Sequence, residues 1–269
     1  MAKKGTRPSR HFRRIRYGHN RLKTKHKHIN PHIPKKIKVP PSWKNVKYYK
    51  GKSYLATGMD KKGRLQYLYP RNVSAKNERR KFRRVERLAK KKRIILNKII
   101  NDAKDGNIEA QAVYTMFQTG FRPGSEKDTK ADKEAFGTVT LLKDHVKLKP
   151  KNKVQFDFIG KKGVRIKKEV KDSLLSDIIK ERQKDDTLFS TNSSEVRDYF
   201  DKKTNGQFQL KDIRTLKAFE VADQVLDNTK SEDPKEIKKE VIKKVSDALG
   251  NTESVAAQSY IAPKLEQFK

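Results

Sequence analysis

The first 59 residues contain 18 Lys and Arg and no Asp or Glu, and the first acidic residue is Asp60. Residues 1–38 also have few apolar residues and no regular spacing between them. Such a segment cannot bury enough apolar surface to offset the entropy lost on ordering, so the sequence predicts a disordered basic arm over residues 1–38. It has no apolar stretch typical of a secretory signal. An organelle transit peptide fits less well, because the arm is rich in Lys and His and poor in Ser.

The rest of the chain is basic as well. Residues 60–269 hold 49 Lys and Arg against 32 Asp and Glu, and the whole chain has a net charge of +35. This excess indicates a polyanionic partner, of which nucleic acid is the commonest. No run approaches 18 apolar residues, so no membrane span is expected. Cys is absent and five of the six His lie within residues 1–32, so we expect no disulfide, no cysteine zinc site and no metal.

Residues 39–72 have the pattern of a small β-rich module. Two short apolar or aromatic runs, Ser53–Ala56 and Gln66–Tyr69, flank a loop that contains Gly58 and Gly63. This spacing predicts a hairpin, and Pro70 ends its second strand.

Residues 73–269 read as mostly helical with a few strands, which makes the expected fold class α+β. A basic amphipathic helix is predicted from Ser74 to Gly106. Further helices are predicted at 107–119, 172–183, 194–203, 210–227, 234–248 and 253–260. Strands are predicted at Gly137–Leu142, Val154–Ile159 and Val164–Val170, the last two joined by a tight turn. No G-x-x-x-x-G-K-[ST] motif is present, so nothing supports ATP hydrolysis.

Five polar residues stand in distinctive local settings. Arg122 lies in Gly-Phe-Arg-Pro-Gly just after a predicted helix, and Lys161 lies on the predicted β-turn. Arg214 falls in the first turns of a helix, in Lys-Asp-Ile-Arg-Thr. Asn251 comes nine residues before Tyr260, which stands in Ser-Tyr-Ile-Ala-Pro. Singly, each is more often a phosphate contact, a cap or a surface residue; the informative feature is their order.

This ordered set resembles the type IB DNA topoisomerases, in particular their short poxvirus-like and bacterial group. The resemblance runs from about Pro40 to Pro263 and leaves out the arm. Residues 55–69, LATGMDKKGRLQYLY, follow the family's ATG-D-x-x-GR-x-QY-x-Y pattern. The resemblance implies a β-rich DNA-binding module over 39–72 and a mostly helical catalytic domain with a small antiparallel sheet over 73–269. Together they would form a clamp on double-stranded DNA.

The resemblance also implies catalytic roles. Tyr260 would attack a backbone phosphodiester and become joined to the 3′ phosphate, while Arg122, Arg214 and Asn251 stabilise the charge that develops on the phosphate oxygens. Lys161 would protonate the 5′ oxygen as it leaves, although the adjacent Lys162 is an alternative. Asn251 stands where poxvirus and eukaryotic members have His, and it cannot take part in acid–base chemistry. No ATP, metal or other cofactor is implied.

Other residues resemble DNA-contacting positions of the family. Arg64, Gln66, Tyr67 and Tyr69 would touch DNA from the N-terminal module, unless that face of the hairpin packs on its own small core. His145, in Lys143-Asp144-His145-Val146, resembles a His that the family carries near a basic residue after a strand. A structural role is the alternative to DNA binding at this position. Residues 216–220, LKAFE, depart from the family's continuation after the second Arg.

Two other functions compete with this interpretation. Tyrosine recombinases share the fold and the tyrosine chemistry, but they usually carry His three residues before the second Arg, where this chain has Lys211. They also lack the ATG…GRxQYxY module. A non-enzymatic basic nucleic-acid-binding protein would satisfy the composition alone. The resemblance implies a monomer located with DNA, whether in a bacterial or archaeal cytoplasm or nucleoid or in a virus or phage particle or infected cell.

Overall fold

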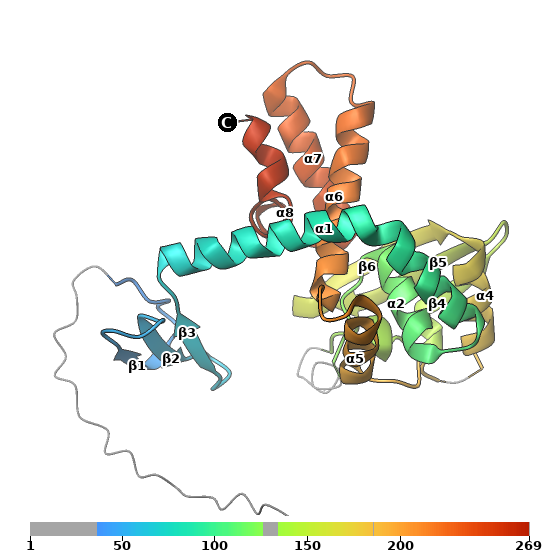
Figure 1. The fold of residues 1–269 in the computed structure, drawn as a ribbon, viewed down its shortest axis with the longest axis horizontal. Coiled ribbons are helices and arrows are strands. Elements are labelled where there is room, and N and C mark those ends of the chain that lie inside the picture. The colour runs from blue at the N-terminus through green and yellow to red at the C-terminus, as the bar shows by residue number, and fades with distance from the viewer. Residues whose placement is uncertain (1–36, 126–133, 185, 269) are drawn as a thin grey trace, which may run out of the picture. The chain divides into compact units, whose positions relative to one another are not determined.

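The structure is a computed structural model that describes residues 37–125, 134–184 and 186–268 (Figure 1). The chain divides into two compact units that meet between Pro70 and Arg71. Within the described residues each unit contains a three-stranded antiparallel sheet. Helices and strands are both present, which confirms the predicted α+β class. Apart from its last two residues, the predicted basic arm lies outside the described residues.

The sheet of the first unit has the strand order β1-β2-β3. Its strands are β1 (Lys44–Tyr48), β2 (Ala56–Met59) and β3 (Leu65–Leu68). The predicted hairpin is the β2–β3 pair, but its first strand begins at Ala56, where the prediction ended it. The turn is fixed by Asp60, whose Oδ1 accepts hydrogen bonds from the backbone N–H groups of Lys62 and Arg64. Strand β1 was not predicted, because its sequence KNVKY offers only two apolar residues to define an alternation.

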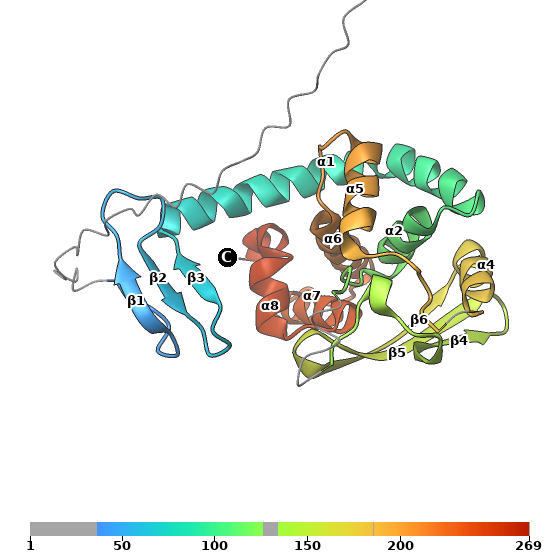
Figure 2. The same ribbon diagram turned by 90° about the horizontal axis from the view of Figure 1, so that it is seen from below.

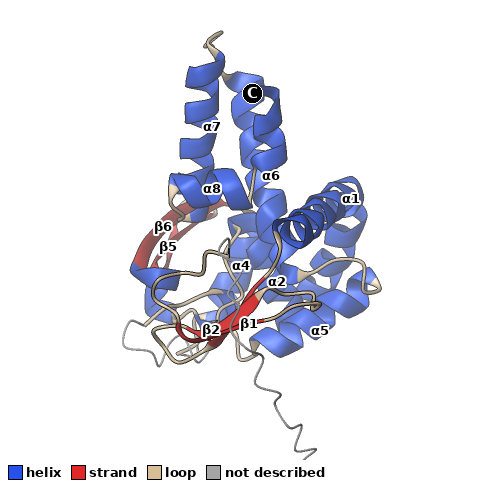
Figure 3. Ribbon diagram, turned by 90° about the vertical axis from the view of Figure 1, so that its left-hand side faces the viewer, coloured by secondary structure: helices blue, strands red, loops and turns tan. Residues whose placement is uncertain are grey.

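The helices of the second unit, drawn in blue in Figure 3, follow the prediction closely. They are α1 (Arg71–Lys104), α2 (Ile108–Thr119), α4 (Ser173–Arg182), α5 (Ser193–Thr204), α6 (Leu210–Asn228), α7 (Pro234–Leu249) and α8 (Glu253–Ser259). Helix α1 buries Phe82, Val85, Leu88, Ile95 and Ile99 on one face, at the helical spacing read from the sequence. It packs on α2, α5 and α6 (Figure 2). None of the helices in the described ranges is long and apolar enough to cross a membrane.

The sheet of the second unit has the strand order β4-β5-β6. Its strands are β4 (Val146–Lys149), β5 (Lys153–Gly160) and β6 (Val164–Lys171). The predicted β5–β6 hairpin is confirmed, with Gly160 paired to Val164 across a short 3₁₀ turn, Lys161–Gly163. Strand β4 was not predicted.

The strand predicted at Gly137–Leu142 is wrong, because Thr138–Thr140 form a 3₁₀ helix. The backbone N–H of Gly137 donates to Thr140 Oγ1, and that of Thr138 donates to the carbonyl of Arg122. These bonds hold the segment in turns against the loop after α2, so its only β pairing in the described residues is a single bridge between Leu142 and Thr187.

Glycines end two of the helices that matter for the site. Gly120 follows α2 with φ 72°, and Gly250 follows α7 with φ 59°. Both are in the left-handed region that closes a helix and that glycine enters at the lowest cost. The chain therefore turns sharply at the ends of α2 and α7, just before Arg122 and Asn251.

Candidate active site

Arg214, on α6, occupies the centre of the site. Its side chain is buried, with 4% of the residue exposed. Nη1 donates to the carbonyl of Gly120 across 2.6 Å, and Nη2 donates to the carbonyl of Leu249. The third nitrogen, Nε, donates to the phenol oxygen of Tyr260 across 3.1 Å. One guanidinium thus joins the end of α2, the end of α7 and the residue after α8.

Asn251 joins the two predicted arginines. Its Oδ1 accepts from Arg122 Nη2 at 3.0 Å and from Arg214 Nη2 at 3.1 Å. Thr252 caps α8 through its side chain, so Asn251 is not needed as the cap. The buried Nδ2 of Asn251 makes no well-formed hydrogen bond within the described ranges, although it lies close enough to Tyr260 to favour the phenolate. A buried donor left in this condition favours an incoming acceptor.

Tyr260 follows directly after α8 and is half-buried. Burial raises the pKa of its phenol, but the positive charges of Arg214 and Arg122 outweigh that effect, so its pKa is lowered below the ordinary value of 10.0. The guanidinium carbon of Arg214 also lies 5.5 Å from the centre of the Tyr260 ring. The surroundings therefore favour a charged, nucleophilic oxygen.

Burial, and secondly the charge of Arg122, lowers the pKa of Arg214 to about 10. Arg214 is therefore still a cation at neutral pH. Two guanidinium groups, one amide donor without a well-formed bond and one phenol oxygen converge in this place. The set is suited to a tetrahedral anion such as phosphate, because Arg forks and amide N–H groups are strong donors to anionic oxygens.

Lys161 lies outside this hydrogen-bonded cluster. It is exposed on the turn between β5 and β6. The turn nevertheless begins near the site, because Ile166 packs against both Gly160, which precedes the turn, and Gly250, which precedes Asn251. A Cβ built at Gly160 would lie 2.6 Å from Ile166 Cδ1, and one built at Gly250 would lie 3.1 Å from Ile166 Cγ1. The side chain of the alternative residue, Lys162, lies outside what the structure describes.

The predicted DNA contacts of the first unit divide into two pairs. Arg64 and Gln66 both donate to Asp60 Oδ2, Arg64 through Nε at 2.8 Å and Gln66 through Nε2 at 3.0 Å. Tyr67 and Tyr69 are exposed and stacked, with ring centres 6.4 Å apart. The tyrosines are partly exposed, and Tyr67 also contacts Tyr54 edge-on with ring centres 5.1 Å apart, whereas Arg64 and Gln66 have a polar partner within the hairpin.

His145 is held in a structural setting. Its Nδ1 accepts from the backbone N–H of Leu142 at 3.1 Å, and its ring lies 4.4 Å from that of Phe136. Burial lowers the pKa of His145, against the opposing charges of Asp144, Asp157 and Glu134. The imidazole is therefore mostly neutral at pH 7 and has one N–H left to donate.

Two residues of α1 that the sequence did not single out support the site. Arg84 makes a two-bond ion pair with Asp212, which is fully buried two residues before Arg214. Lys81 Nζ donates to the carbonyl of Ser259, next to Tyr260, at 2.7 Å. Helix α1 carries so many cations that no sequence signal separates these two from the rest.

No group of three His, Cys, Asp or Glu side chains is arranged to hold a metal ion in residues 37–125, 134–184 and 186–268. The cations of the site itself are the groups available there to meet negative charge.

Comparison with known proteins places the chain in a family. Residues 70–267 match the family described as "Eukaryotic DNA topoisomerase I, catalytic core". The chain is also similar to a protein named DNA topoisomerase 1B from Acanthamoeba polyphaga mimivirus, with 26% identity over 256 residues, covering 84% of this chain and 76% of that protein. All five residues predicted as catalytic lie within the matched range. The chain therefore belongs to the DNA topoisomerase I family, as an enzyme of the type IB class.

Proposed function

We propose that the protein relaxes supercoiled DNA by cutting one strand through Tyr260, letting the duplex rotate, and resealing the strand without ATP or a metal ion. The observation that carries this proposal is the hydrogen bond from Arg214 to the Tyr260 oxygen, in a cluster that also contains Arg122 and Asn251. A nucleophile, two cations and an amide donor close together suit the transfer of a phosphodiester to tyrosine.

The Tyr260 oxygen attacks the phosphorus and forms a phosphotyrosyl bond to the 3′ end, while the bond from phosphorus to the 5′ oxygen breaks. The phenol proton leaves to solvent, which the lowered pKa of Tyr260 favours. One phosphoester replaces another, so the reverse attack by the 5′ hydroxyl restores the strand and releases Tyr260 without an external energy source.

Charge builds up on the non-bridging oxygens in the transition state. Arg122 and Arg214 offset this charge, and the Nδ2 of Asn251 donates a neutral hydrogen bond to the same oxygens. Since an amide does not titrate, Asn251 contributes no proton to the reaction.

The leaving 5′ oxygen needs a proton, and Lys161 supplies it in this proposal. Lys161 is exposed on the β5–β6 turn, and Ile166 packs that hairpin against Gly250. A short movement of the turn on binding DNA brings the ammonium group to the leaving oxygen.

DNA binding is mainly electrostatic in this proposal and falls steeply with salt, as the net charge of +35 implies. The exposed parts of Tyr67 and Tyr69, together with Arg64, Gln66 and His145, add contacts to duplex DNA. The protein acts as a monomer whose two units hold the duplex, and residues 1–38 add non-specific affinity.

Relaxation of a supercoiled plasmid in EDTA, without ATP, tests the proposal. The wild type and Tyr199→Phe are expected to relax the plasmid, since the Tyr199 hydroxyl bonds to Asp102 outside the site. Tyr260→Phe is expected to bind the plasmid and leave it supercoiled. If the wild type binds the plasmid but does not relax it, the result would favour a non-enzymatic nucleic-acid-binding protein. A covalent complex that exchanges strands between two duplexes, without relaxation, would point to a recombinase.

A further inference from the structure

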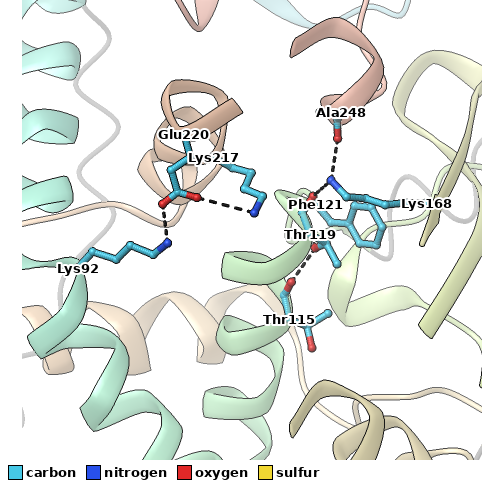
Figure 4. Close-up of polar contacts among 8 residues, drawn as sticks. All are labelled: Lys92, Thr115, Thr119, Phe121, Lys168, Lys217, Glu220 and Ala248. Carbon is cyan, nitrogen blue, oxygen red and sulfur yellow. Dashed lines mark hydrogen bonds and ion pairs between the residues drawn. The ribbon is translucent and has the colours of Figure 1, made fainter. Parts of the chain in front are cut away.

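Lys168 is a lysine on the inward face of a strand. Along β6 the partly buried positions are Val164, Ile166, Lys168 and Val170, alternating with exposed residues. Lys168 Nζ donates to the carbonyl of Thr119 at 2.7 Å and to that of Ala248 at 2.9 Å (Figure 4). A lysine in the apolar register of a strand costs desolvation energy, so a specific set of acceptors is expected to hold it there.

These acceptors lie in the last turns of two helices, α2 and α7. Arg214 donates to the next carbonyl along each helix, those of Gly120 and Leu249. Two cations from different elements, β6 and α6, therefore bridge the same two helix ends one residue apart. Carbonyls at helix ends lack helical partners and carry partial negative charge, so two such ends approach each other favourably only with donors or cations between them.

Lys168 remains mostly protonated at neutral pH. Burial, followed by the charges of Lys217 and Arg214, lowers its pKa to about 8. Lys217 does not replace it, because its ammonium group faces Glu220 at 3.7 Å, and Glu220 also pairs with Lys92 (Figure 4).

The bridged carbonyls lie three residues before two members of the site: Thr119 precedes Arg122, and Ala248 precedes Asn251. We propose that Lys168 is a positioning residue, which with Arg214 fixes the ends of α2 and α7 so that Arg122 and Asn251 meet at the phosphate. The effect on catalysis rests on the proposed function, while the effect on the geometry of the site does not.

The test is Lys168→Met, which keeps most of the length of the side chain and removes its donors. Lys171→Met is the matched control, because it removes an exposed cation from the same strand. Single-turnover cleavage of a nicked duplex by excess enzyme is expected to be about 10- to 100-fold slower for Lys168→Met, the range for a misplaced catalytic group. The control is expected to cleave at the wild-type rate, and DNA affinity is expected to change by less than about threefold for Lys168→Met.

A mutant cycle separates positioning from a loss of stability. If Lys168 acts through Asn251, then adding Lys168→Met to Asn251→Ala slows cleavage by a clearly smaller factor than Lys168→Met does in the wild type. Two results would overturn the proposal. In one, the double variant slows cleavage by the product of the two single factors; in the other, Lys168→Met lowers the Tm but cleaves at the wild-type rate.

A second measurement does not depend on cleavage. Displacing Arg122 and Asn251 weakens their support of the Tyr260 phenolate, so Lys168→Met is expected to raise the pKa of Tyr260 in a spectroscopic titration. An unchanged Tyr260 titration would contradict the positioning role. A wild type that does not cleave, combined with the expected change in titration, would refute the proposed function and leave this inference standing.

Discussion

Arg214 Nε donates to the phenol oxygen of Tyr260 across 3.1 Å, while the two terminal nitrogens of the same guanidinium hold the carbonyls of Gly120 and Leu249. The group that bonds to the proposed nucleophile therefore also fixes the helix ends that precede Arg122 and Asn251. Changes at Arg214 are expected to affect catalysis and folding together, and the two effects can be measured separately.

Arg214→Lys is expected to lower the single-turnover cleavage rate by about 10²-fold or more, because an ammonium group cannot reproduce the three-way fork. The unmade bonds to buried carbonyls are expected to lower the free energy of unfolding by about 1–3 kcal/mol. Urea denaturation and cleavage of a nicked duplex measure the two effects. Arg197→Lys, on the exposed face of α5, is the control. A rate within about tenfold of wild type would show that charge alone suffices.

Tyr260 is expected to ionise below the pKa of an ordinary tyrosine. A nearby cation favours the phenolate, so removing one in Arg122→Ala raises the pKa of Tyr260. The measurement is the absorbance of phenolate against pH, taken as the difference between wild type and Tyr260→Phe. Burial raises the pKa values of Tyr114 and Tyr199, which therefore ionise after Tyr260, and the difference spectrum removes the transitions of the tyrosines that both proteins share. A lower pKa in Arg122→Ala would contradict the assigned electrostatics.

Arg84→Met is expected to lower the free energy of unfolding by about 3–5 kcal/mol, because it leaves the carboxylate of Asp212 buried without its cation. Arg83→Met removes the neighbouring exposed cation of α1 and should change the free energy of unfolding by less than about 0.5 kcal/mol. Urea unfolding followed by circular dichroism compares them. Equal stabilities would mean that the Asp212 pair contributes nothing to folding.

Gly58→Ala is expected to disturb the first unit alone. A Cβ at this position would lie 2.6 Å from Trp43 Cε3, so the indole has to move. Trp43 is the single tryptophan of the chain, and its fluorescence reports on this unit. We expect a shifted emission spectrum with unchanged helical circular dichroism. Wild-type fluorescence would show that the strand adjusts without displacing the ring.

Lys161→Ala is expected to slow cleavage of ordinary DNA by about 10²- to 10⁴-fold, the usual contribution of a general acid. A substrate with sulfur in place of the 5′ bridging oxygen has a leaving group that needs no proton, so it should restore the rate. The same pair of measurements on Lys162→Ala separates the two lysines. Full rescue of Lys162→Ala but not of Lys161→Ala would transfer the acid role to Lys162.

Much of the fold was predictable because its helices carry local signals. The Asp233–Pro234 start of α7 and the glycines after α2 and α7 set helix limits that the structure confirms. The strand prediction for Gly137–Leu142 was wrong because side-chain hydrogen bonds in that turn outweigh β propensity.

The site was less predictable than the fold. Local motifs located Arg122, Arg214, Asn251 and Tyr260 along the chain, but only the folded chain shows that one guanidinium bonds to three separate segments. Lys168 did leave a signal, since it interrupts the apolar alternation of β6 on the side that Ile166 and Val170 share. Lys81 and Arg84 left none.

Asn251 places an amide between two arginines and leaves one buried donor without a well-formed bond. An aspartate there would pair with both cations and make the resting protein more stable, yet it would repel the phosphate. In the proposed function the amide therefore serves phosphate binding and forgoes the more stable ion-paired arrangement that a carboxylate would give the resting site.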